Sequence, residues 1–596
     1  MHGAIDHPRP GTGPPTTTPV RISPHCPRRP KCDHYGMNRR LLSYVHGTSM
    51  EPLTGLTVGG VLDHTAATWP ELDAVVVPNE GIRWSWGELQ REAKRLAAGL
   101  LASGLEPGDR IGILAPNLAE WVAVQFGTAY AGLILVNINP AYRTSELEYA
   151  LKKTACRAIV TIPKFKTSDY LAMLSEIVPE LATATPGRLE SDRLPSMRLV
   201  VTLGNETYPG TLRYADIIAA ADAGSLERVD GIAATLDSDD PINIQFTSGT
   251  TGSPKAATLT HHNIVNNAAL SAGILRFTEK DRLCIPVPMY HCFGMVLGVL
   301  LCATRGAAIV FPSAGFDADA VLDAVETDRC TALHGVPTMF IAELDTENFE
   351  ARDLSSLRTG IMAGAPCPVE LMHRVIDEMN LAEITIGYGM TETGPLSTQT
   401  SIDDPPELRV TTVGRAMPHT EIKIIDEDGR TVPIGESGEL CTRGYCVMRG
   451  YWDDPERTAE VIDPAGWIRT GDLAEMDESG YVAIVGRLKD MIIRGGENIY
   501  PREIEEFLYT NPKIDQVEVF GVPDMKFGEE VAAWIRLKAG ETATIEEVKD
   551  YCKGELAHFK IPRYVKFVDE FPMTVTGKVQ KFAMRDVMAE ELRLAG

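Results

Sequence analysis

A loop rich in hydroxyl side chains and glycine gives the sequence its strongest chemical signal. It runs from Thr247 to Lys255 and contains five Ser or Thr residues and two glycines. Glycine lets the backbone approach a ligand closely, while hydroxyls and backbone N–H groups donate hydrogen bonds to phosphate oxygens. The loop does not match the Walker P-loop pattern, because Pro254 precedes the lysine and Ala256 follows it. Apolar alternation before the loop and helical spacing after it predict a phosphate-binding strand–turn–helix, with a Ser/Thr-rich surface loop as the alternative.

Further segments carry single polar side chains that suit a nucleotide. Glu392 follows a predicted strand in a glycine-flanked turn, where one carboxylate oxygen could hold Mg²⁺. Asp472 could accept from ribose hydroxyls, and Arg487 could donate to ribose or phosphate. Lys578 is expected on a loop 18 residues before the end of the chain. Each of these residues alone also fits an ordinary solvated side chain.

The elements that must position these residues alternate between strand and helix. Apolar periodicity predicts a helix from residue 89 that ends at Gly104, a strand over 111–114, a helix over 121–130 and a strand over 133–136. The same alternation returns around residues 309, 361 and 386, which indicates βαβ units and a parallel sheet. A hairpin is expected over 421–442, and an αβ unit of about a hundred residues follows Gly486.

Composition excludes several classes of protein. The 596-residue chain has 57 Lys and Arg against 82 Asp and Glu, a formal net charge of −25, which argues against a nucleic-acid partner. No apolar run reaches the roughly 18 residues that a membrane span needs. The 11 cysteines contain no C-x-x-C pair. Cys26 and Cys32 lack a second pair at zinc-finger spacing, so free thiols in an intracellular protein are expected.

The first 50 residues differ from the rest in composition. They contain eight prolines and seven Lys or Arg against two acidic residues. Such a segment has no apolar signal core, and its prolines interrupt an amphipathic presequence helix. We therefore expect residues 1–50 to be disordered and not needed for activity. Two alternatives are an organelle transit peptide and a later translation start at Met37 or Met50.

In this order and spacing, the motifs resemble the adenylate-forming (AMP-binding) superfamily over about residues 55–590. Within it they are most similar to the fatty-acid–CoA ligases, and to the medium-chain acyl-CoA synthetase branch in particular. Ala256 departs from that branch, which usually has glycine after the lysine. The departure affects the expected conformation where the chain leaves the loop and does not affect the expectation of phosphate binding. The segments that carry the closer resemblance are residues 139–142, 288–294, 413–415, 489–501 and 558–562.

The resemblance implies an α/β fold, with a large N-terminal domain of βαβ subdomains and a β-rich subdomain, and a small mobile α+β C-terminal domain. The expected boundaries are residues 1–50 for the disordered extension, 51–487 for the AMP-binding domain and 488–596 for the lid domain. The implied substrates are a fatty acid, ATP and coenzyme A, with Mg²⁺ as cofactor. The products are acyl-CoA, AMP and pyrophosphate, formed through an acyl-adenylate.

The resemblance also implies roles for individual residues. The loop would hold the β- and γ-phosphates, Thr391 would contact the α-phosphate, and Glu392 would bind Mg²⁺. Lys578 would bridge the acid and the α-phosphate, and His291 would lie at the catalytic centre. The phosphate-loop residues are Thr247, Ser248, Gly249, Thr250, Thr251, Gly252, Ser253, Pro254 and Lys255; the adenine and ribose residues are Gly364, Ala365, Pro366, Tyr388, Asp472 and Arg487; the coenzyme A residues are Gly495 and Gly496; and the hinge is Lys489.

Three hypotheses follow, and the first is favoured. It is a free-standing fatty-acid–CoA ligase of medium or longer chain preference, located in the cytoplasm, or in an organelle matrix if residues 1–50 are a transit peptide. The second keeps the chemistry but activates an aryl or other acid, or loads a carrier protein. The third is a catalytically inactive lipid- or nucleotide-binding protein, which would be expected to lack Glu392, Asp472, Arg487 or Lys578. All four residues are present.

Gly294 and Gly298 could leave room for an unbranched acyl chain, or could serve helix packing.

Overall fold

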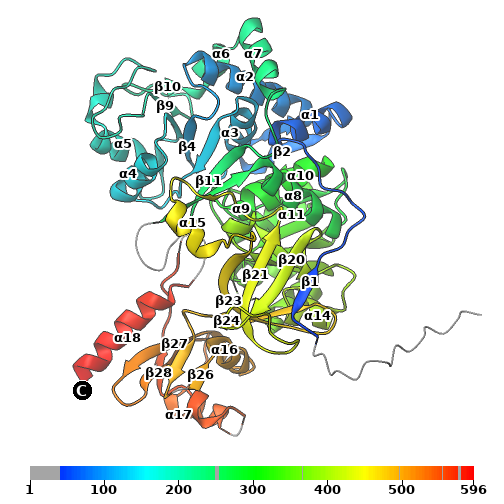
Figure 1. Ribbon diagram of the computed structural model, residues 1–596, viewed down its shortest axis with the longest axis vertical. Helices are drawn as coiled ribbons and strands as arrows, with labels where there is room; N and C mark the ends of the chain where they lie inside the picture. The colour runs from blue at the N-terminus through cyan, green and yellow to red at the C-terminus, as the bar shows by residue number, and fades with distance from the viewer. Residues whose placement is uncertain are drawn as a thin grey trace, which may run out of the picture. The chain divides into compact units, whose positions relative to one another are not determined.

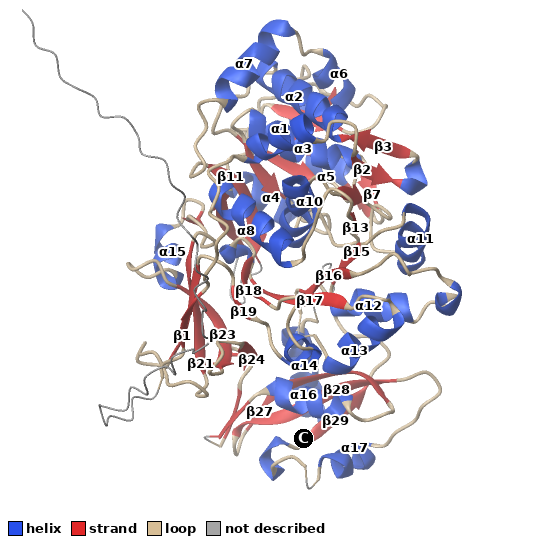
Figure 2. Ribbon diagram, turned by 90° about the vertical axis from the view of Figure 1, so that its right-hand side faces the viewer, coloured by secondary structure: helices blue, strands red, loops and turns tan. Residues whose placement is uncertain are grey.

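Parallel and antiparallel sheets, flanked by helices, make up the chain (Figures 1 and 2). The structure, a computed structural model, describes residues 41–247, 254–365, 367–495, 497–553, 555–574 and 579–595. The predicted α/β fold class is confirmed by the alternation of strands and helices through the first four hundred or so residues.

The first sheet has a parallel body with an antiparallel edge. Its parallel strands are buried apolar runs, as expected where helices cover both faces. The register pairs Ile111 with Leu135 and Ile244 with Val136. In spatial order, its strands are β10 (Leu212–Arg213), β9 (Leu199–Thr202), β6 (Ala158–Thr161), β4 (Arg110–Leu114), β5 (Ile134–Asn137), β11 (Pro241–Thr247), β12 (Lys255–Thr260) and β22 (Gly450–Tyr451).

The second sheet is also parallel at its centre and antiparallel at both edges. Its strands β16 and β17 run side by side, with Ala363 opposite Gly387. In spatial order, its strands are β19 (Arg415–Ala416), β18 (Leu396–Gln399), β17 (Glu383–Gly389), β16 (Thr359–Ala363), β15 (Ala332–Gly335), β13 (Arg282–Cys284), β14 (Ala308–Val310), β2 (Asp73–Val77) and β3 (Ile82–Ser85).

The third sheet is antiparallel and contains the predicted hairpin. It is drawn in yellow in Figure 1, apart from the blue strand β1 at its edge. Its strands are β1 (Tyr44–His46), β20 (Thr420–Ile425), β21 (Gly438–Gly444), β23 (Ile468–Met476) and β24 (Val482–Arg487).

Strand β1 corrects the prediction that residues 1–50 are disordered, as far as residues 41–50 are concerned. Tyr44 pairs with Lys423 of β20, and the side chain of Ser43 is fully buried. The prolines that suggested disorder all lie before residue 31. The short strand β1 follows them, and the sequence did not reveal it because its backbone hydrogen bonds are made with a distant strand, β20. Residues 1–40 lie outside the described residues.

The C-terminal αβ unit is built on an antiparallel pair, β27 and β28, with β29 added in parallel. Ile514, Val517, Val531 and Ile535 form its core together with Ile504 of the covering helix α16. Its strands are β25 (Ile492–Arg494), β26 (Glu497–Ile499), β27 (Ile514–Asp524), β28 (Gly528–Leu537) and β29 (Tyr564–Phe567). A separate small hairpin joins β7 (Lys164–Phe165) and β8 (Ser168–Asp169).

Helices cover the sheets. The helix predicted from Leu89 is α2, which begins at Trp86 because Ser85 and Glu88 form a reciprocal capping box. The larger helices are α1 (Val58–Thr68), α2 (Trp86–Ala102), α3 (Ala119–Tyr130), α4 (Thr144–Lys153), α5 (Tyr170–Ile177), α7 (Ala223–Ala233), α8 (His261–Ile274), α11 (Ala318–Asp328), α12 (Pro337–Leu344), α13 (Val369–Glu378), α16 (Pro501–Tyr509), α17 (Ile545–Cys552) and α18 (Lys581–Ala595). Shorter ones are α6 (Tyr214–Ala219), α9 (Cys292–Gly294), α10 (Leu301–Arg305), α14 (Pro406–Thr411) and α15 (Pro455–Val461).

The strand–turn–helix predicted around the phosphate loop is wrong in one respect. Strand β11 is present, but the chain returns as the antiparallel strand β12, with Thr247 opposite Lys255, before α8 begins. Residues 256–259 are buried, so this short run extends the sheet instead of starting the helix. The loop is therefore flanked by two strands, and its residues 248–253 lie outside the described residues.

Candidate active site

The predicted nucleotide residues come from three sheets, and most of them lie at or just beyond strand ends. Thr247 ends β11 in the first sheet, and Gly364 and Glu392 follow β16 and β17 in the second. Asp472 and Arg487 are opposite each other on β23 and β24 of the third sheet. Ligands of open parallel sheets bind beyond the carboxyl ends of the strands, which is where Thr247, Gly364 and Glu392 lie.

Glu392, which follows β17 of the second sheet, makes hydrogen bonds to two strands of the first sheet. It lies in a short 3₁₀ helix, Thr391–Thr393, and is 5% exposed. Its Oε1 accepts hydrogen bonds from Thr247 Oγ1 at 3.0 Å and from the Tyr451 hydroxyl at 2.9 Å. The backbone N–H of Met448 also donates to the Glu392 carbonyl at 2.9 Å. The carboxylate is thus held from two directions through a single oxygen.

Tyr388 connects the second sheet to the third. Its hydroxyl donates to Oδ2 of Asp472 at 2.6 Å, while Arg487 Nε donates to Oδ1 at 3.1 Å. Burial and the charge of Asp472 raise the pKa of the Tyr388 phenol, so it remains a donor at neutral pH. Three residues that the sequence placed in the nucleotide site are therefore brought together by direct hydrogen bonds.

Gly364, which the resemblance assigns to the adenine pocket, follows directly after β16. Gly364 has a φ of +88° and is exposed, while Ala365 is half-buried. A residue with a side chain is strained at this left-handed φ, whereas glycine adopts it at little cost. Glycine therefore allows the sharp turn at the end of the strand. Pro366 lies outside the described residues.

The segment 288–294 packs beside Thr391. Cys292 Sγ lies 3.7 Å from Thr391 Oγ1, and His291 begins the short helix α9, its Nδ1 accepting from the Phe293 N–H at 3.2 Å. The ring of Phe293 stacks on His334 at 5.6 Å. Burial lowers the pKa of His334 to about 4, so this ring is neutral. The segment therefore lies next to the proposed α-phosphate contact through Cys292, and the catalytic role of His291 stays a prediction.

Gly294 and Gly298 serve packing. A Cβ added at Gly294 would lie 2.4 Å from the carbonyl oxygen of Pro288, and one at Gly298 would lie 2.9 Å from Cδ1 of Ile285. Protein atoms therefore occupy the space beside both glycines, and of the two interpretations of these residues, packing is the one that the geometry favours.

The remaining predicted residues fall near or beyond the third sheet. Lys489 is exposed, in the connection between β24 and β25. Gly495 has a φ of +62°, and its N–H donates to the Phe527 carbonyl at 2.8 Å. Several predicted site residues lie outside the described residues, and their roles stay predictions: Ser248, Gly249, Thr250, Thr251, Gly252, Ser253, Gly496 and Lys578.

Sequence reasoning missed Tyr451. This residue lies on β22, which pairs with β12 so that Ala257 is opposite Tyr451. Its hydroxyl accepts from Lys255 Nζ at 3.0 Å and donates to Glu392. Tyr451 follows a glycine and precedes Trp452, and nothing in this local pattern indicates a contact with a residue 196 positions earlier.

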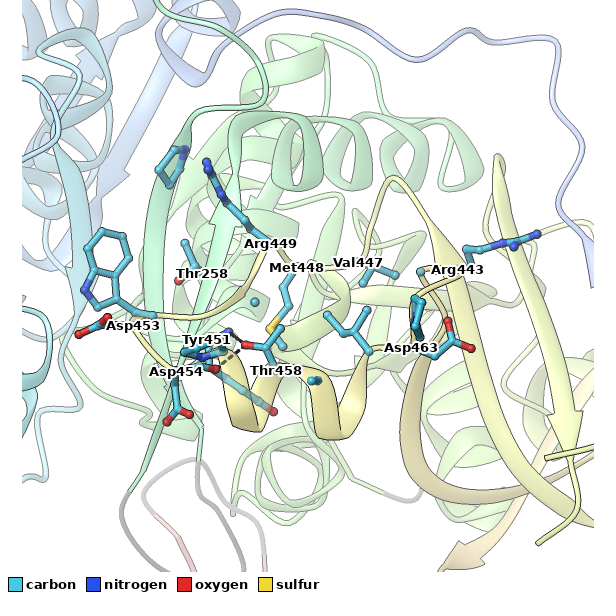
Figure 3. Close-up of a pocket in the computed structure, with 18 of the residues that line it drawn as sticks. Thr258, Arg443, Val447, Met448, Arg449, Tyr451, Asp453, Asp454, Thr458 and Asp463 are labelled. Carbon is cyan, nitrogen blue, oxygen red and sulfur yellow. Dashed lines mark hydrogen bonds between the residues drawn. The ribbon is translucent and has the colours of Figure 1, made fainter. Parts of the chain in front are cut away.

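Tyr451 also lines an open groove of about 1120 Å³ between β12, α15 and the chain that joins β21 to β22 (Figure 3). None of the site residues predicted from the sequence lines this groove; it reaches the predicted site through Tyr451 and Met448, which both bond to Glu392. No helix in the described part of the chain is long and apolar enough to cross a membrane. The nine cysteines among the described residues are all buried and free, while Cys26 and Cys32 lie outside the described residues.

Strands β11 and β12 flank the predicted phosphate loop, Glu392 is buried beside Thr247, and Asp472 contacts both Tyr388 and Arg487, an arrangement that suits a nucleotide. The profile of the AMP-binding enzyme family matches residues 62–452, and that of the AMP-binding enzyme C-terminal domain matches residues 503–578. The chain belongs to the AMP-binding enzyme family, so the resemblance drawn from the motifs is confirmed.

Individual relatives agree with this assignment. Over 547 residues, the chain is 49% identical to YngI of Bacillus subtilis (strain 168), whose name marks it as a candidate acyl-CoA synthetase; the match covers 92% of this chain and 100% of that protein. It is 47% identical to the mitochondrial medium-chain acyl-CoA ligase ACSF2 of Danio rerio, covering 93% and 91%. The crystal structure of the anthranilate CoA ligase AuaEII in complex with anthranoyl-AMP superimposes with a TM-score of 0.78 at 26% identity, covering 90% of this chain and 98% of that one.

Proposed function

We propose that this protein is a fatty-acid–CoA ligase, which joins a fatty acid to AMP with release of pyrophosphate and then transfers the acyl group to coenzyme A. The observation that carries the proposal is a pair of hydrogen bonds made from the end of β17: Glu392 accepts from Thr247 of the first sheet, and Tyr388 donates to Asp472 of the third. Acyl-CoA ligase relatives at 47–49% identity over most of the chain support the acyl-CoA product.

In the first half-reaction, an anionic carboxylate must approach the negatively charged α-phosphate of ATP. Catalysis therefore depends on screening charge where it develops. Lys255 would donate to the outer phosphates and Thr391 to the α-phosphate, while Asp472 and Arg487 would hold the ribose. Lys578 would carry a mobile ammonium to the reacting oxygens. A lysine suits this role because its flexible stem carries a compact charge.

Glu392 fits a magnesium site. Its Oε1 accepts both of the hydrogen bonds described for the carboxylate, so Oε2 is the oxygen that would bind the ion. One carboxylate combined with substrate phosphates and water is a donor set that Mg²⁺ prefers. Bound there, the ion would supply further neutralisation of phosphate charge.

In the second half-reaction, the coenzyme A thiol must reach the carbonyl carbon of the acyl-adenylate. We propose that residues 488–596 rotate about Lys489, withdraw Lys578 and bring Gly495 and Gly496 towards the pantetheine arm. The large domain is then residues 51–487, to which Leu41–Met50 add β1. The exposed position of Lys489 between β24 and β25 supports a hinge there.

Substrate class and location complete the proposal. The name of the Danio rerio relative supports a medium-chain acid, and its mitochondrial label supports an organelle matrix as the alternative to the cytoplasm. AuaEII, an anthranilate CoA ligase, keeps an aryl acid as the second candidate.

The test is a panel of acids from acetate to palmitate, with anthranilate added, assayed for ATP–pyrophosphate exchange and for coenzyme A thioester. We expect both activities to be highest with an aliphatic acid of medium or longer chain. Lys578→Ala should lower exchange by about 100-fold or more, because it removes a charge that acts at the transition state. A best substrate that is aromatic would reject the fatty-acid assignment, and absence of exchange with every acid would reject the ligase.

A further inference from the structure

The hydroxyl of Tyr451 lies between the two charged groups that the proposed function assigns to ATP. Lys255 Nζ donates to Tyr451 Oη at 3.0 Å, and Tyr451 Oη donates to Glu392 Oε1 at 2.9 Å. The Lys255 ammonium also lies 4.7 Å from the centroid of the tyrosine ring. The three side chains therefore form a single chain of donors and acceptors that runs from a cation to an anion.

This arrangement replaces a direct ion pair. Among the described side chains, no ion pair joins Lys255 to Glu392, although both contact the same hydroxyl. In a direct ion pair, the ammonium of Lys255 and the carboxylate of Glu392 would bind each other. A neutral tyrosine between them leaves N–H donors of Lys255 and one oxygen of Glu392 to bind a ligand. Burial and the charge of Glu392 raise the pKa of the Tyr451 phenol, so the bridge remains protonated and neutral.

The surrounding structure fixes the bridge in place. Tyr451 is 6% exposed, and its backbone N–H donates to Thr458 Oγ1 at 2.9 Å. Thr458 lies on α15, so this bond holds β22 against the helix, and the Thr458 hydroxyl in turn donates to the Asp454 carbonyl at the start of α15 at 2.7 Å (Figure 3). Pairing of β22 with β12 sets Tyr451 in register two residues beyond Lys255. The backbone of Tyr451 is therefore anchored to the helix α15 on one side and to the neighbouring strand β12 on the other.

We propose that Tyr451 is a positioning residue that holds Lys255 and Glu392 apart and aims both at the phosphate chain of ATP. The inference rests on the proposed function only in taking ATP as the ligand. It predicts that the hydroxyl matters for nucleotide binding and adenylation, and that it has no part in transfer of the acyl group to coenzyme A.

The test is Tyr451→Phe, which keeps the ring and removes the bridge. The matched control is Tyr481→Phe, because Tyr481 is also a buried tyrosine whose hydroxyl donates to a carboxylate, Asp404, at 2.6 Å. Four quantities are measured for each variant: the melting temperature, the calorimetric affinity for ATP with and without Mg²⁺, the rate of ATP–pyrophosphate exchange, and the rate of thioester formation from supplied acyl-adenylate and coenzyme A.

We expect Tyr451→Phe to weaken ATP binding about tenfold, both with and without Mg²⁺, and to slow exchange at least as much, because it disturbs two charged partners. Thioester formation from supplied acyl-adenylate should stay within about twofold of the wild-type rate, since that step does not use the phosphate-binding groups. Tyr481→Phe should leave ATP affinity and both half-reactions within about twofold. On a Lys255→Met background, Tyr451→Phe should have a smaller effect than in the wild type, because the two residues act together.

The contrary results are distinct. Unchanged ATP affinity in Tyr451→Phe, or equal losses in both half-reactions, would overturn the proposal. Failure of Tyr451→Phe to fold while Tyr481→Phe folds would also overturn it, since the role would then be structural. The calorimetric measurement uses neither acid nor coenzyme A. A wild type that forms no thioester, combined with a Tyr451→Phe variant that still loses ATP affinity, would therefore reject the ligase but support the positioning role.

Discussion

The hydroxyl of Tyr388 donates a 2.6 Å hydrogen bond to Asp472, a residue 84 positions further along the chain and in a different sheet. The same carboxylate accepts from Arg487 on the neighbouring strand. Asp472 is therefore fixed on both oxygens, and the third sheet is connected to the second at the proposed ribose position. Changes at this carboxylate should affect nucleotide binding first.

Asp472→Asn should raise the KM for ATP about tenfold with little change in kcat. The substitution removes the charge that holds Arg487, and interactions with ribose are made equally in the ground state and the transition state. ATP–pyrophosphate exchange measured over a range of ATP concentrations checks this. Asp477→Asn, at an exposed position just after β23, is the control and should change neither constant. A fall in kcat with an unchanged KM would assign Asp472 to the chemical step instead.

Lys489→Pro should slow thioester formation more than adenylation. Proline fixes φ and restricts the preceding residue Leu488, so it stiffens the connection between β24 and β25. Lys489→Ala removes the same side chain but keeps the backbone free, and we expect it to preserve the balance between the half-reactions. The two rates are measured separately, by pyrophosphate exchange and by thioester formation from supplied acyl-adenylate. Equal losses in both for the proline variant would count against a hinge at this residue.

Glu343→Leu should stabilise the protein, and more so as the pH rises. Glu343 is fully buried on α12, and neither carboxyl oxygen has a hydrogen-bond partner among the described residues. Burial raises its pKa well above the usual 4.5, so the carboxyl is protonated in the folded state. Above the unfolded-state pKa, unfolding releases this proton, and wild-type stability falls by about 1.4 kcal/mol per pH unit until the folded-state pKa is reached.

Denaturant unfolding at pH 5, 7 and 8 tests this. The leucine variant lacks the titration, so its advantage should be smallest at pH 5 and grow by about 1.4 kcal/mol per pH unit up to the folded-state pKa of Glu343. Glu347→Leu, at an exposed position four residues later, should show no such trend. An advantage that does not depend on pH would mean that the folded-state pKa of Glu343 is not raised.

Removal of residues 1–50 should lower the melting temperature, whereas removal of residues 1–40 should leave it unchanged. The longer deletion takes away β1, its pairing with β20 and the buried side chain of Ser43, and it exposes the edge of the third sheet. Thermal unfolding of the two truncated proteins beside the full chain measures the difference. If the melting temperatures of the two truncations agree, β1 contributes nothing to stability.

Much of the fold could be predicted from the sequence because its signals are local. Helix α2 has both a capping box and an apolar face, and strands β4 and β5 are buried runs that only a covered parallel sheet accommodates. Strand β12 was missed for the opposite reason. Its five buried residues carry no turn signal between themselves and α8, so a short strand looked like the approach to a helix.

The types of the site residues were readable, but their contacts were not. Spacing identified Thr247, Glu392 and Asp472 as nucleotide-binding candidates, and the structure joins each of them to a partner on another element. Tyr451 gave no signal of its own, because its importance arises from sheet pairing between β22 and β12 and not from neighbours in the chain.

The sequence by itself determined which chemistry the chain could carry, since phosphate-binding loops, carboxylates and lysines are properties of short segments. Only the tertiary structure decided which of those groups work on one another. A hydrogen bond between Lys255 and Tyr451 depends on the order of strands in a sheet, and that order is set by how buried surfaces of distant segments pack together.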